Sequence, residues 1–236
     1  MKVSVILPAA GLGTRMKSVA AERTGTSRKQ FMLLDGVPIL VHTIRKFVAC
    51  EPVSEVIVAC RADDMNWVRE TVSAENFAKP VRAVEGGETR QHSVENGLAA
   101  VDPSTDIVVV HDAVRPFIDT ATIGRVIEEA ATHGAAIVGI VPTDTVKQVH
   151  GHKIRGTLNR DRLILAQTPQ GFRAELLRRA YAKANEDDFV GTDESSLVER
   201  LDELEVSVVP GSDRNIKITK PSDMELARLY LAQEKA

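Results

Sequence analysis

The stretch VSVILPAAGLGTRMK, residues 3–17, decides the fold of this chain. Its β-branched beginning, residues 3–7, predicts a strand. Glycines in the loop that follows lack a Cβ, so backbone N–H groups there can come close to a phosphate. The dinucleotide fingerprint and the P-loop pattern both require a glycine where Met16 stands. An ordinary strand-to-helix turn is the alternative, but Arg15 and Lys17 favour an anion site that is neither an NAD site nor a P-loop.

Beyond this stretch, short apolar runs alternate with amphipathic segments. The periodicity predicts strands at residues 55–60, 81–84, 107–111, 135–141 and 206–209, and helices at 38–48, 63–72, 94–101, 123–130, 174–184, 195–204 and from Ser222 onward. Strands that are apolar throughout and alternate with helices are typical of parallel sheets covered on both faces. The chain is therefore predicted to be an α/β protein with a Rossmann-like, mostly parallel sheet flanked by helices.

The pattern changes at residues 142–162, PTDTVKQVHGHKIRGTLNRDR. Valines alternate with polar residues before His150-Gly151, and a second short run follows, which predicts a polar β-hairpin inserted into a single domain of residues 1–236. An exposed two-stranded hairpin is only marginally stable alone. This arm is therefore predicted to pack against a second subunit and to make the protein a homodimer.

Composition limits the kinds of partner. The net charge of -3 gives no excess of positive charge of the kind that nucleic-acid-binding proteins use. No apolar stretch approaches the roughly 18 residues that a membrane helix needs, and the first residues lack a secretory signal. The two cysteines offer neither a disulfide framework nor a zinc spacing. We therefore expect a cytoplasmic protein that binds neither nucleic acid nor membranes.

Several motifs, spread over nearly the whole chain, resemble those of sugar-phosphate nucleotidyltransferases. They are PAAGLGTRM at 8–16 with KQF at 29–31, GGETRQHSV at 86–94, VHDAVRPF at 110–117, DTVK at 144–147, AQTPQGF at 166–172, TDESSLVE at 192–199 and NIKIT at 215–219. Within that superfamily they are most similar to the 2-C-methyl-D-erythritol 4-phosphate cytidylyltransferase family of the non-mevalonate isoprenoid pathway. The resemblance implies transfer of CMP from CTP to 2-C-methyl-D-erythritol 4-phosphate, which gives 4-diphosphocytidyl-2-C-methyl-D-erythritol and pyrophosphate.

The chemistry of such a transfer explains which residue types the motifs contain. The nucleophile is a phosphate oxygen that is already anionic near neutral pH, so no general base is needed. Catalysis then depends on positioning two polyanions and stabilising the charge that develops on the α-phosphate and the departing pyrophosphate. Asp112 follows a strand at the carboxyl edge, where α/β sheets bind ligands, and is the predicted Mg²⁺ ligand. A helix or turn cap is the alternative role for this residue.

The resemblance also implies a role for each matched residue. The predicted catalytic residues are Arg15, Lys29 and Lys217, and the predicted nucleotide contacts are Ala9, Ala10, Gly11, Gly13, Gly87, Glu88, Ser93 and Ala113. The predicted acceptor contacts are Arg115, Thr145, Arg160, Thr168 and Thr192, together with Lys217. In the family, the arm that carries Thr145 and Arg160 completes the site of the neighbouring subunit.

This chain departs from the family pattern in two places. The segment before Lys29, residues 18–28, is longer than usual and ends in Arg28 where the family has proline, and Glu88 stands where the family often has aspartate. Two other functions are compatible with the motifs. One is a ribitol 5-phosphate cytidylyltransferase, which shares the glycine loop and the HDAVRPF-type segment. The other is a non-catalytic nucleotide-binding module, since a fold alone does not establish activity.

Overall fold

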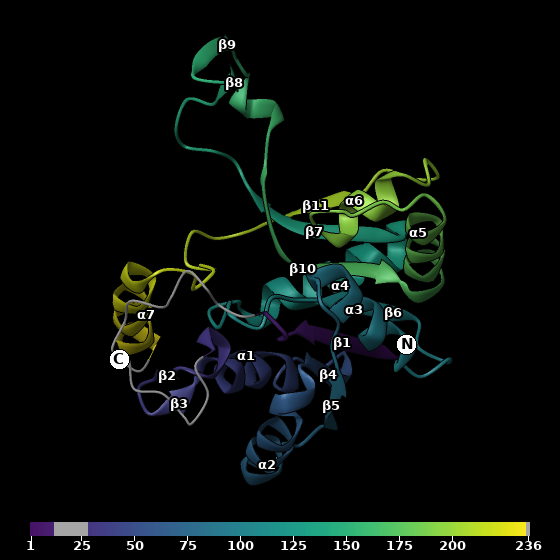
Figure 1. The fold of residues 1–236 in the computed structure, drawn as a ribbon, viewed down its shortest axis with the longest axis vertical. Coiled ribbons are helices and arrows are strands. Elements are labelled where there is room, and N and C mark those ends of the chain that lie inside the picture. Colours follow the sequence, from purple (N-terminus) through teal and green to yellow (C-terminus); the bar gives the residue numbers. More distant parts are fainter. Residues whose placement is uncertain (12–27, 235–236) are drawn as a thin grey trace.

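A computed structural model of the protein describes residues 1–11 and 28–234. Its centre is a seven-stranded sheet in the order β11-β7-β10-β6-β1-β4-β5 (Figure 1). The strands are β1 (Val3–Pro8), β4 (Val53–Cys60), β5 (Val81–Glu85), β6 (Ile107–Val110), β7 (Ala135–Ile140), β10 (Leu165–Arg173) and β11 (Ser207–Pro210). Strands β5, β4, β1 and β6 are parallel to one another, and β7 is parallel to β11. The predicted α/β fold with a mostly parallel sheet is confirmed.

Strand β10 was not predicted, and it is antiparallel to both of its neighbours, β6 and β7. Its sequence, LAQTPQGFR, is largely polar and contains Pro169, and proline is rare inside a strand because it cannot donate a ladder hydrogen bond. The strand accommodates Pro169 where the register shifts between Gln167 and Gln170. Because β10 runs opposite to β6, its first half lies at the carboxyl edge of the parallel strands.

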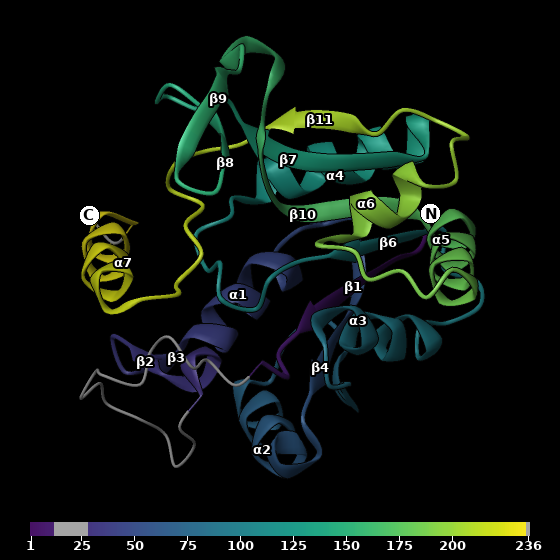
Figure 2. The same cartoon turned by 45° about the horizontal axis from the view of Figure 1, so that its top comes forward.

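Helices cover both faces of the sheet (Figure 2). One face packs against α1 (Ile39–Val48), α2 (Met65–Glu75) and α4 (Thr120–His133), and the other against α3 (Arg90–Ala99), α5 (Ala174–Glu186) and α6 (Glu194–Glu199). Successive strand residues point to opposite faces, so Val5 and Leu7 of β1 join the first core and Ile6 joins the second. Helix α6 ends earlier than the predicted limit at residue 204, and the chain then turns through Asp202 with a φ of 52°.

Several further elements lie around the carboxyl edge. They are η2 (Lys29–Phe31), the β2 (Leu33–Leu34) and β3 (Val37–Pro38) hairpin, η3 (Ala62–Asp64) and the last helix, α7 (Pro221–Glu234). Helix α7 packs through Met224, Ala227 and Leu231 against a cluster that includes Met32 and Leu34. It therefore supports the segment that carries Lys29. None of the helices in the described part of the chain has both the length and the apolar composition needed to span a bilayer.

The predicted arm is a separate two-stranded hairpin, β8 (Lys147–His150) and β9 (Lys153–Thr157), followed by η4 (Arg160–Arg162). Figure 1 shows it standing away from the central sheet at the end of two long connections. Its apolar side chains have little to pack against in the same chain, and Val149 and Ile154 are 60% and 65% exposed. The hairpin itself is confirmed, while its contact with a second subunit stays a prediction.

Candidate active site

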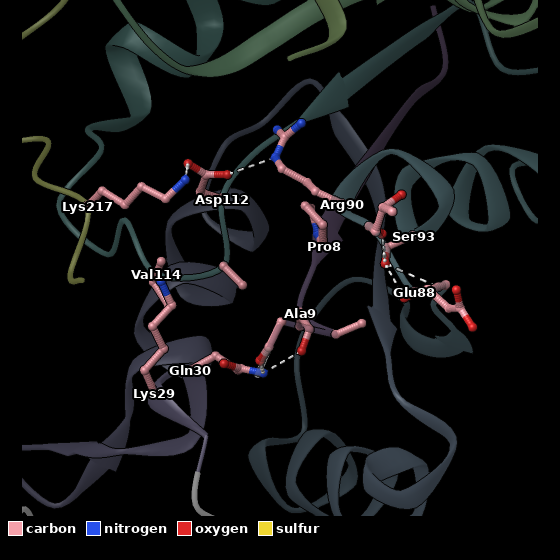
Figure 3. Close-up of a pocket in the computed structure, with 15 residues that line it drawn as sticks. Pro8, Ala9, Lys29, Gln30, Glu88, Arg90, Ser93, Asp112, Val114 and Lys217 are labelled. Atoms are coloured by element: carbon pink, nitrogen blue, oxygen red, sulfur yellow. Dashed lines mark hydrogen bonds and ion pairs between the residues drawn. The ribbon is translucent and has the colours of Figure 1, made fainter. Parts of the chain in front are cut away.

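A cavity of about 250 Å³ opens at the carboxyl edge of β1, β5 and β6, and we call it the glycine-loop cavity (Figure 3). Parallel strands end at the same edge, so loops far apart in sequence meet there. Its described lining includes the predicted residues Ala9, Ala10, Gly11, Lys29, Gly87, Glu88, Ser93, Asp112, Ala113 and Lys217. The structure therefore brings together every predicted nucleotide contact that it describes. Gly13 and Arg15 lie outside the described residues.

A second cavity of about 240 Å³ adjoins the first, and we call it the β10 cavity. Three predicted acceptor contacts, Arg115, Thr168 and Thr192, line it. Arg90, Asp112 and Lys217 line both cavities, so these three side chains form a shared wall. Two ligands bound in the two cavities would meet at this wall.

The other two predicted acceptor contacts lie elsewhere. Thr145 and Arg160 are exposed residues of the arm and line neither the glycine-loop cavity nor the β10 cavity. The Arg160 guanidinium donates to the backbone oxygen of Thr143 instead. Within one chain the structure does not bring these two residues to the site, and their predicted role requires the arm of a second copy.

The loop of residues 86–89 is held in place by Ser93. The Ser93 Oγ donates to the backbone oxygen of Thr89 at 2.8 Å and accepts from the Gly87 N–H at 3.1 Å. Thr89 in turn caps α3 by accepting from the His92 N–H. Ser93 is 1% exposed, so its hydroxyl shapes the loop from inside the protein. The cavity wall formed by Gly87 and Glu88 is therefore fixed by the protein itself.

Gly87 is required for this loop shape. A Cβ at Gly87 would lie 2.4 Å from the Cβ of His92, so Gly87→Ala must displace the loop. Overpacking of this kind costs about 1–3 kcal/mol. A displaced loop should lose contact energy of the same order with the predicted ligand CTP, so we expect the Kd for CTP to rise about 10- to 100-fold. Gly124→Ala is the matched control, because a Cβ there meets nothing within 4 Å. Calorimetric titration with CTP measures both variants, and an unchanged Kd for Gly87→Ala would remove the 86–89 loop from the predicted nucleotide contacts.

Gln30 connects the glycine loop to the segment that carries Lys29. Its buried side chain donates through Nε2 to the backbone oxygens of Ala9 at 2.5 Å and Gly11 at 3.2 Å. Gln30 thus fixes the beginning of the glycine loop beside η2. In Figure 3, Lys29 and Lys217 lie on one side of the view, and Glu88 and Ser93 on the other. The cavity therefore has a cationic side and a side formed by the 86–89 loop.

Asp112 is the centre of a cluster of three cations. Its Oδ1 lies 3.3 Å from the Arg90 Nε, and its Oδ2 lies 3.2 Å from the Arg115 Nε and 2.9 Å from the Lys217 Nζ. Burial raises the pKa of the Asp112 carboxyl, but the charges of Lys217, Arg90 and Arg115 outweigh burial and hold that pKa well below its usual range. Asp112 is therefore ionised, and its side chain pairs with cations and not with a helix end.

The predicted magnesium site depends on the donor groups that the protein supplies. The described residues contain no group of three or more His, Cys, Asp or Glu side chains that could hold a metal ion by themselves. Mg²⁺ usually binds through one or two carboxylates and completes its shell with phosphates and water. The ionised Asp112 carboxylate at the wall of both cavities fits that requirement, because it supplies one hard oxygen ligand beside the space available for phosphates.

His111 supports the same strand end from the core. It is fully buried, its Nε2 lies 3.0 Å from the backbone oxygen of Arg115, and its ring lies 4.9 Å from that of Phe47. Burial lowers the pKa of His111 to about 4, although the hydrogen bond to Arg115 opposes this shift. His111 is therefore neutral and structural.

This pKa predicts a pH-dependent stability. Unfolded histidine has a pKa of about 6.5, so between about pH 6.5 and about pH 4 the unfolded chain binds a proton that folded His111 does not. The free energy of unfolding should fall by up to about 3 kcal/mol as the pH decreases through this window. His111→Gln should lose this decrease, whereas His152→Gln, in the exposed arm, should keep it. Urea unfolding at several pH values measures the difference, and equal pH profiles for the His111 variant and the wild type would contradict it.

Sequence reasoning missed two polar residues of the site. Arg90 lies within GGETRQHSV, yet its partners Asp112 and Glu194 come from distant parts of the chain. Asn215 lies within NIKIT and is buried, and its Nδ2 donates at 2.9 Å to the backbone oxygen of Thr168. The Asn215 backbone oxygen accepts from Arg115 at 2.6 Å. Their place inside the matched motifs was the available signal.

Proteins similar in sequence belong to the family that the motifs resemble. The family model for 2-C-methyl-D-erythritol 4-phosphate cytidylyltransferase matches residues 3–233. A protein of that name from Solibacter usitatus is 60% identical over 100% of this chain and 98% of its own length. One from Acidobacterium capsulatum is 53% identical over 99% of this chain and 98% of its own length.

Solved structures extend the similarity to the fold. The 4-diphosphocytidyl-2C-methyl-D-erythritol synthase from Anaerococcus prevotii superposes with a TM-score of 0.84 at 31% identity, covering 98% of each chain. The 2-C-methyl-D-erythritol 4-phosphate cytidylyltransferase from Thermus thermophilus has a TM-score of 0.76 at 32% identity, covering 98% of this chain and 100% of its own. With a family model that spans nearly the whole sequence and relatives this similar, the chain belongs to the 2-C-methyl-D-erythritol 4-phosphate cytidylyltransferase family.

Proposed function

We propose that the protein transfers CMP from CTP to 2-C-methyl-D-erythritol 4-phosphate in non-mevalonate isoprenoid biosynthesis. The observation that carries this proposal is the shared wall, where Asp112 and Lys217 border both the glycine-loop cavity and the β10 cavity. Family membership supports the same assignment. CTP would occupy the glycine-loop cavity and the acceptor phosphate the β10 cavity, so that the two anions meet beside these side chains. We place the reaction in the cytoplasm, where the two unpaired cysteines would remain reduced.

The reaction follows from these positions. An oxygen of the acceptor phosphate forms a bond to the α-phosphorus of CTP, and the bond from that phosphorus to the β-phosphate oxygen breaks, releasing pyrophosphate. Lys29 lines the glycine-loop cavity and would neutralise the triphosphate, while Lys217 at the shared wall would bring the two phosphates together. Arg15 would act with Lys29. Positioning and charge neutralisation are the contributions required of the protein.

Asp112 would hold Mg²⁺ together with oxygens of the triphosphate. When bound, the ion supplies positive charge to phosphate oxygens, which lowers the repulsion between the two substrates. Asp112 itself stays ionised because Lys217, Arg90 and Arg115 surround it. We expect turnover to stop on chelation of divalent ions and to return with added Mg²⁺.

A pyrophosphate-release assay with two acceptors tests the proposal. We expect turnover of CTP with 2-C-methyl-D-erythritol 4-phosphate and little with ribitol 5-phosphate. Turnover with ribitol 5-phosphate alone would assign the protein to the related activity. Binding of CTP with no product from either acceptor in the presence of Mg²⁺ would instead indicate a non-catalytic nucleotide-binding module.

We also propose that the arm, residues 142–162, joins two copies of the chain and brings Thr145 and Arg160 to the partner's β10 cavity. The exposed Val149 and Ile154 support this contact, because isolated hairpins seldom leave such side chains uncovered. Val149→Glu combined with Ile154→Glu should convert a dimer into a monomer in sedimentation experiments. Leu229→Glu, at an exposed position of α7, should remain dimeric. A monomeric wild type would overturn the proposed dimer.

A further inference from the structure

Arg90 lies within a matched motif, but none of the predicted site roles falls on it. It is the first residue of α3, and its side chain lines both the glycine-loop cavity and the β10 cavity. Its Nε lies 3.3 Å from Asp112 Oδ1, and its Nη1 lies 2.7 Å from Glu194 Oε1. One guanidinium therefore joins a carboxylate at the end of β6 to a carboxylate at the beginning of α6.

Glu194 is buried more completely than its partner. It is 1% exposed, and Arg90 is its only ion-pair partner in the part of the chain that the structure describes. Its Oε1 also accepts from the Tyr181 hydroxyl at 3.3 Å, whereas no described group hydrogen-bonds to its buried Oε2. A buried carboxylate with a single cationic partner holds that partner strongly, because separating them would leave an unpaired buried charge.

The surroundings of Glu194 belong to the acceptor side of the site. Thr192 lines the β10 cavity two positions earlier, and Asp193 caps α6 by accepting from the Ser196 N–H. The Asp193 carboxylate also accepts from the buried Gln170 of β10. Glu194 is thus anchored by the same turn that presents Thr192, and through Arg90 this turn is connected to the 86–89 loop of the other cavity.

We propose that Glu194 is a positioning residue that keeps the Arg90 guanidinium on Asp112, at the wall between the two cavities. An arginine beside a triphosphate would otherwise pair with phosphate oxygens, because guanidinium and phosphate form strong bidentate contacts. Such a contact would remove the ion pair at Asp112 Oδ1. Among the described residues, Arg115 and Lys217 would then hold the carboxylate through Oδ2 alone. Asp112 and Glu194 oppose a contact of Arg90 with phosphate, because their carboxylates already hold its guanidinium at Nε and at Nη1. This inference rests on the proposed cytidylyl transfer.

The test compares variants that alter the Arg90–Glu194 ion pair from either side. Glu194→Gln keeps the shape of the side chain and an acceptor for Arg90 but removes the charge. We expect kcat to fall about 10- to 100-fold, with an equal or lower KM for CTP and a KM for the acceptor within about threefold of the wild type, because a released Arg90 would pair with bound CTP in the ground state. Arg90→Lys keeps the charge but cannot contact both carboxylates with one forked group, and should show the same loss of kcat.

Tyr181→Phe is the matched control, because it removes the other hydrogen bond to Glu194 Oε1 and leaves the Arg90 pair in place. We expect wild-type kcat for this variant, even if its melting temperature falls. A loss of kcat in Tyr181→Phe as large as in Glu194→Gln would show that packing alone matters and would overturn the inference. Glu194→Gln and Arg90→Lys with kcat within threefold of an active wild type would overturn it as well. An inactive wild type would overturn the proposed function and this inference together.

Discussion

Replacing Asp112 by Asn is expected to lower kcat about 1,000-fold, the upper end of what loss of one preorganised electrostatic group costs. The amide keeps the volume but removes the charge that Arg90, Arg115 and Lys217 share. These three cations would then repel one another at the wall between the cavities. The variant would also lose the carboxylate that we propose as the Mg²⁺ ligand.

The same substitution should reduce stability, because Asp112 is buried with an 8% exposed side chain. Breaking a buried ion pair costs about 3–5 kcal/mol, so urea unfolding should detect a decrease of about 3 kcal/mol. Asp213→Asn, an exposed residue close to Asn215, is the matched control and should change neither quantity. A variant with wild-type kcat would exclude Asp112 from metal binding and from the reaction, whatever its stability.

The sequence predicted the architecture where local pattern and tertiary burial agree. The continuous apolar run of β6 has residues buried on both faces, with Val109 in one core and Val108 in the other. The helix pattern of α4 likewise matches its buried residues, because Ile123, Val126 and Ile127 face the sheet. In these elements the spacing of apolar residues along the sequence determines both the secondary structure and the face that packs against the core.

Prediction from the pattern failed where tertiary contacts override it. The polar run of β10, with Pro169 and Gly171, has no strand period, yet residues 167–172 are buried between β6 and β7. Its polar groups find partners that no local rule supplies: Gln167 accepts from Asn215, and Gln170 donates to Asp193. Such partners are visible only once the chain has folded.

The candidate active site likewise contains residues that the sequence predicted and residues that it did not. Residues matched by motif, such as Gly87 and Lys217, lie at the glycine-loop cavity as expected, because strand ends determine where loops meet. The Arg90–Glu194 pair could not be predicted, because its members are separated by 104 positions and neither residue type signals pairing by itself. Thr145 and Arg160 line neither cavity in one folded chain, and the role proposed for them requires the arm of a second copy.

Replacing Lys29 by Ala is expected to lower kcat about 100- to 1,000-fold while the Kd for CTP rises less than about fivefold. Lys29 lines the glycine-loop cavity on the side of Lys217 and opposite Glu88 and Ser93 (Figure 3). In the proposed CTP complex we therefore expect it to lie beside the phosphates, near the other cation. Negative charge on the leaving pyrophosphate grows as the reaction proceeds, so a cation there stabilises the transition state more than bound CTP.

Single-turnover kinetics and equilibrium titration separate these two quantities for the Lys29 variant. Lys220→Ala, an exposed lysine outside both cavities, is the matched control and should behave as the wild type. An unchanged kcat with a large rise in the Kd would assign Lys29 to ground-state binding, and wild-type values for both would remove it from the site. The expected split, a large loss of kcat with a small loss of affinity, requires Lys29 to contact charge that appears only as the phosphate bond breaks.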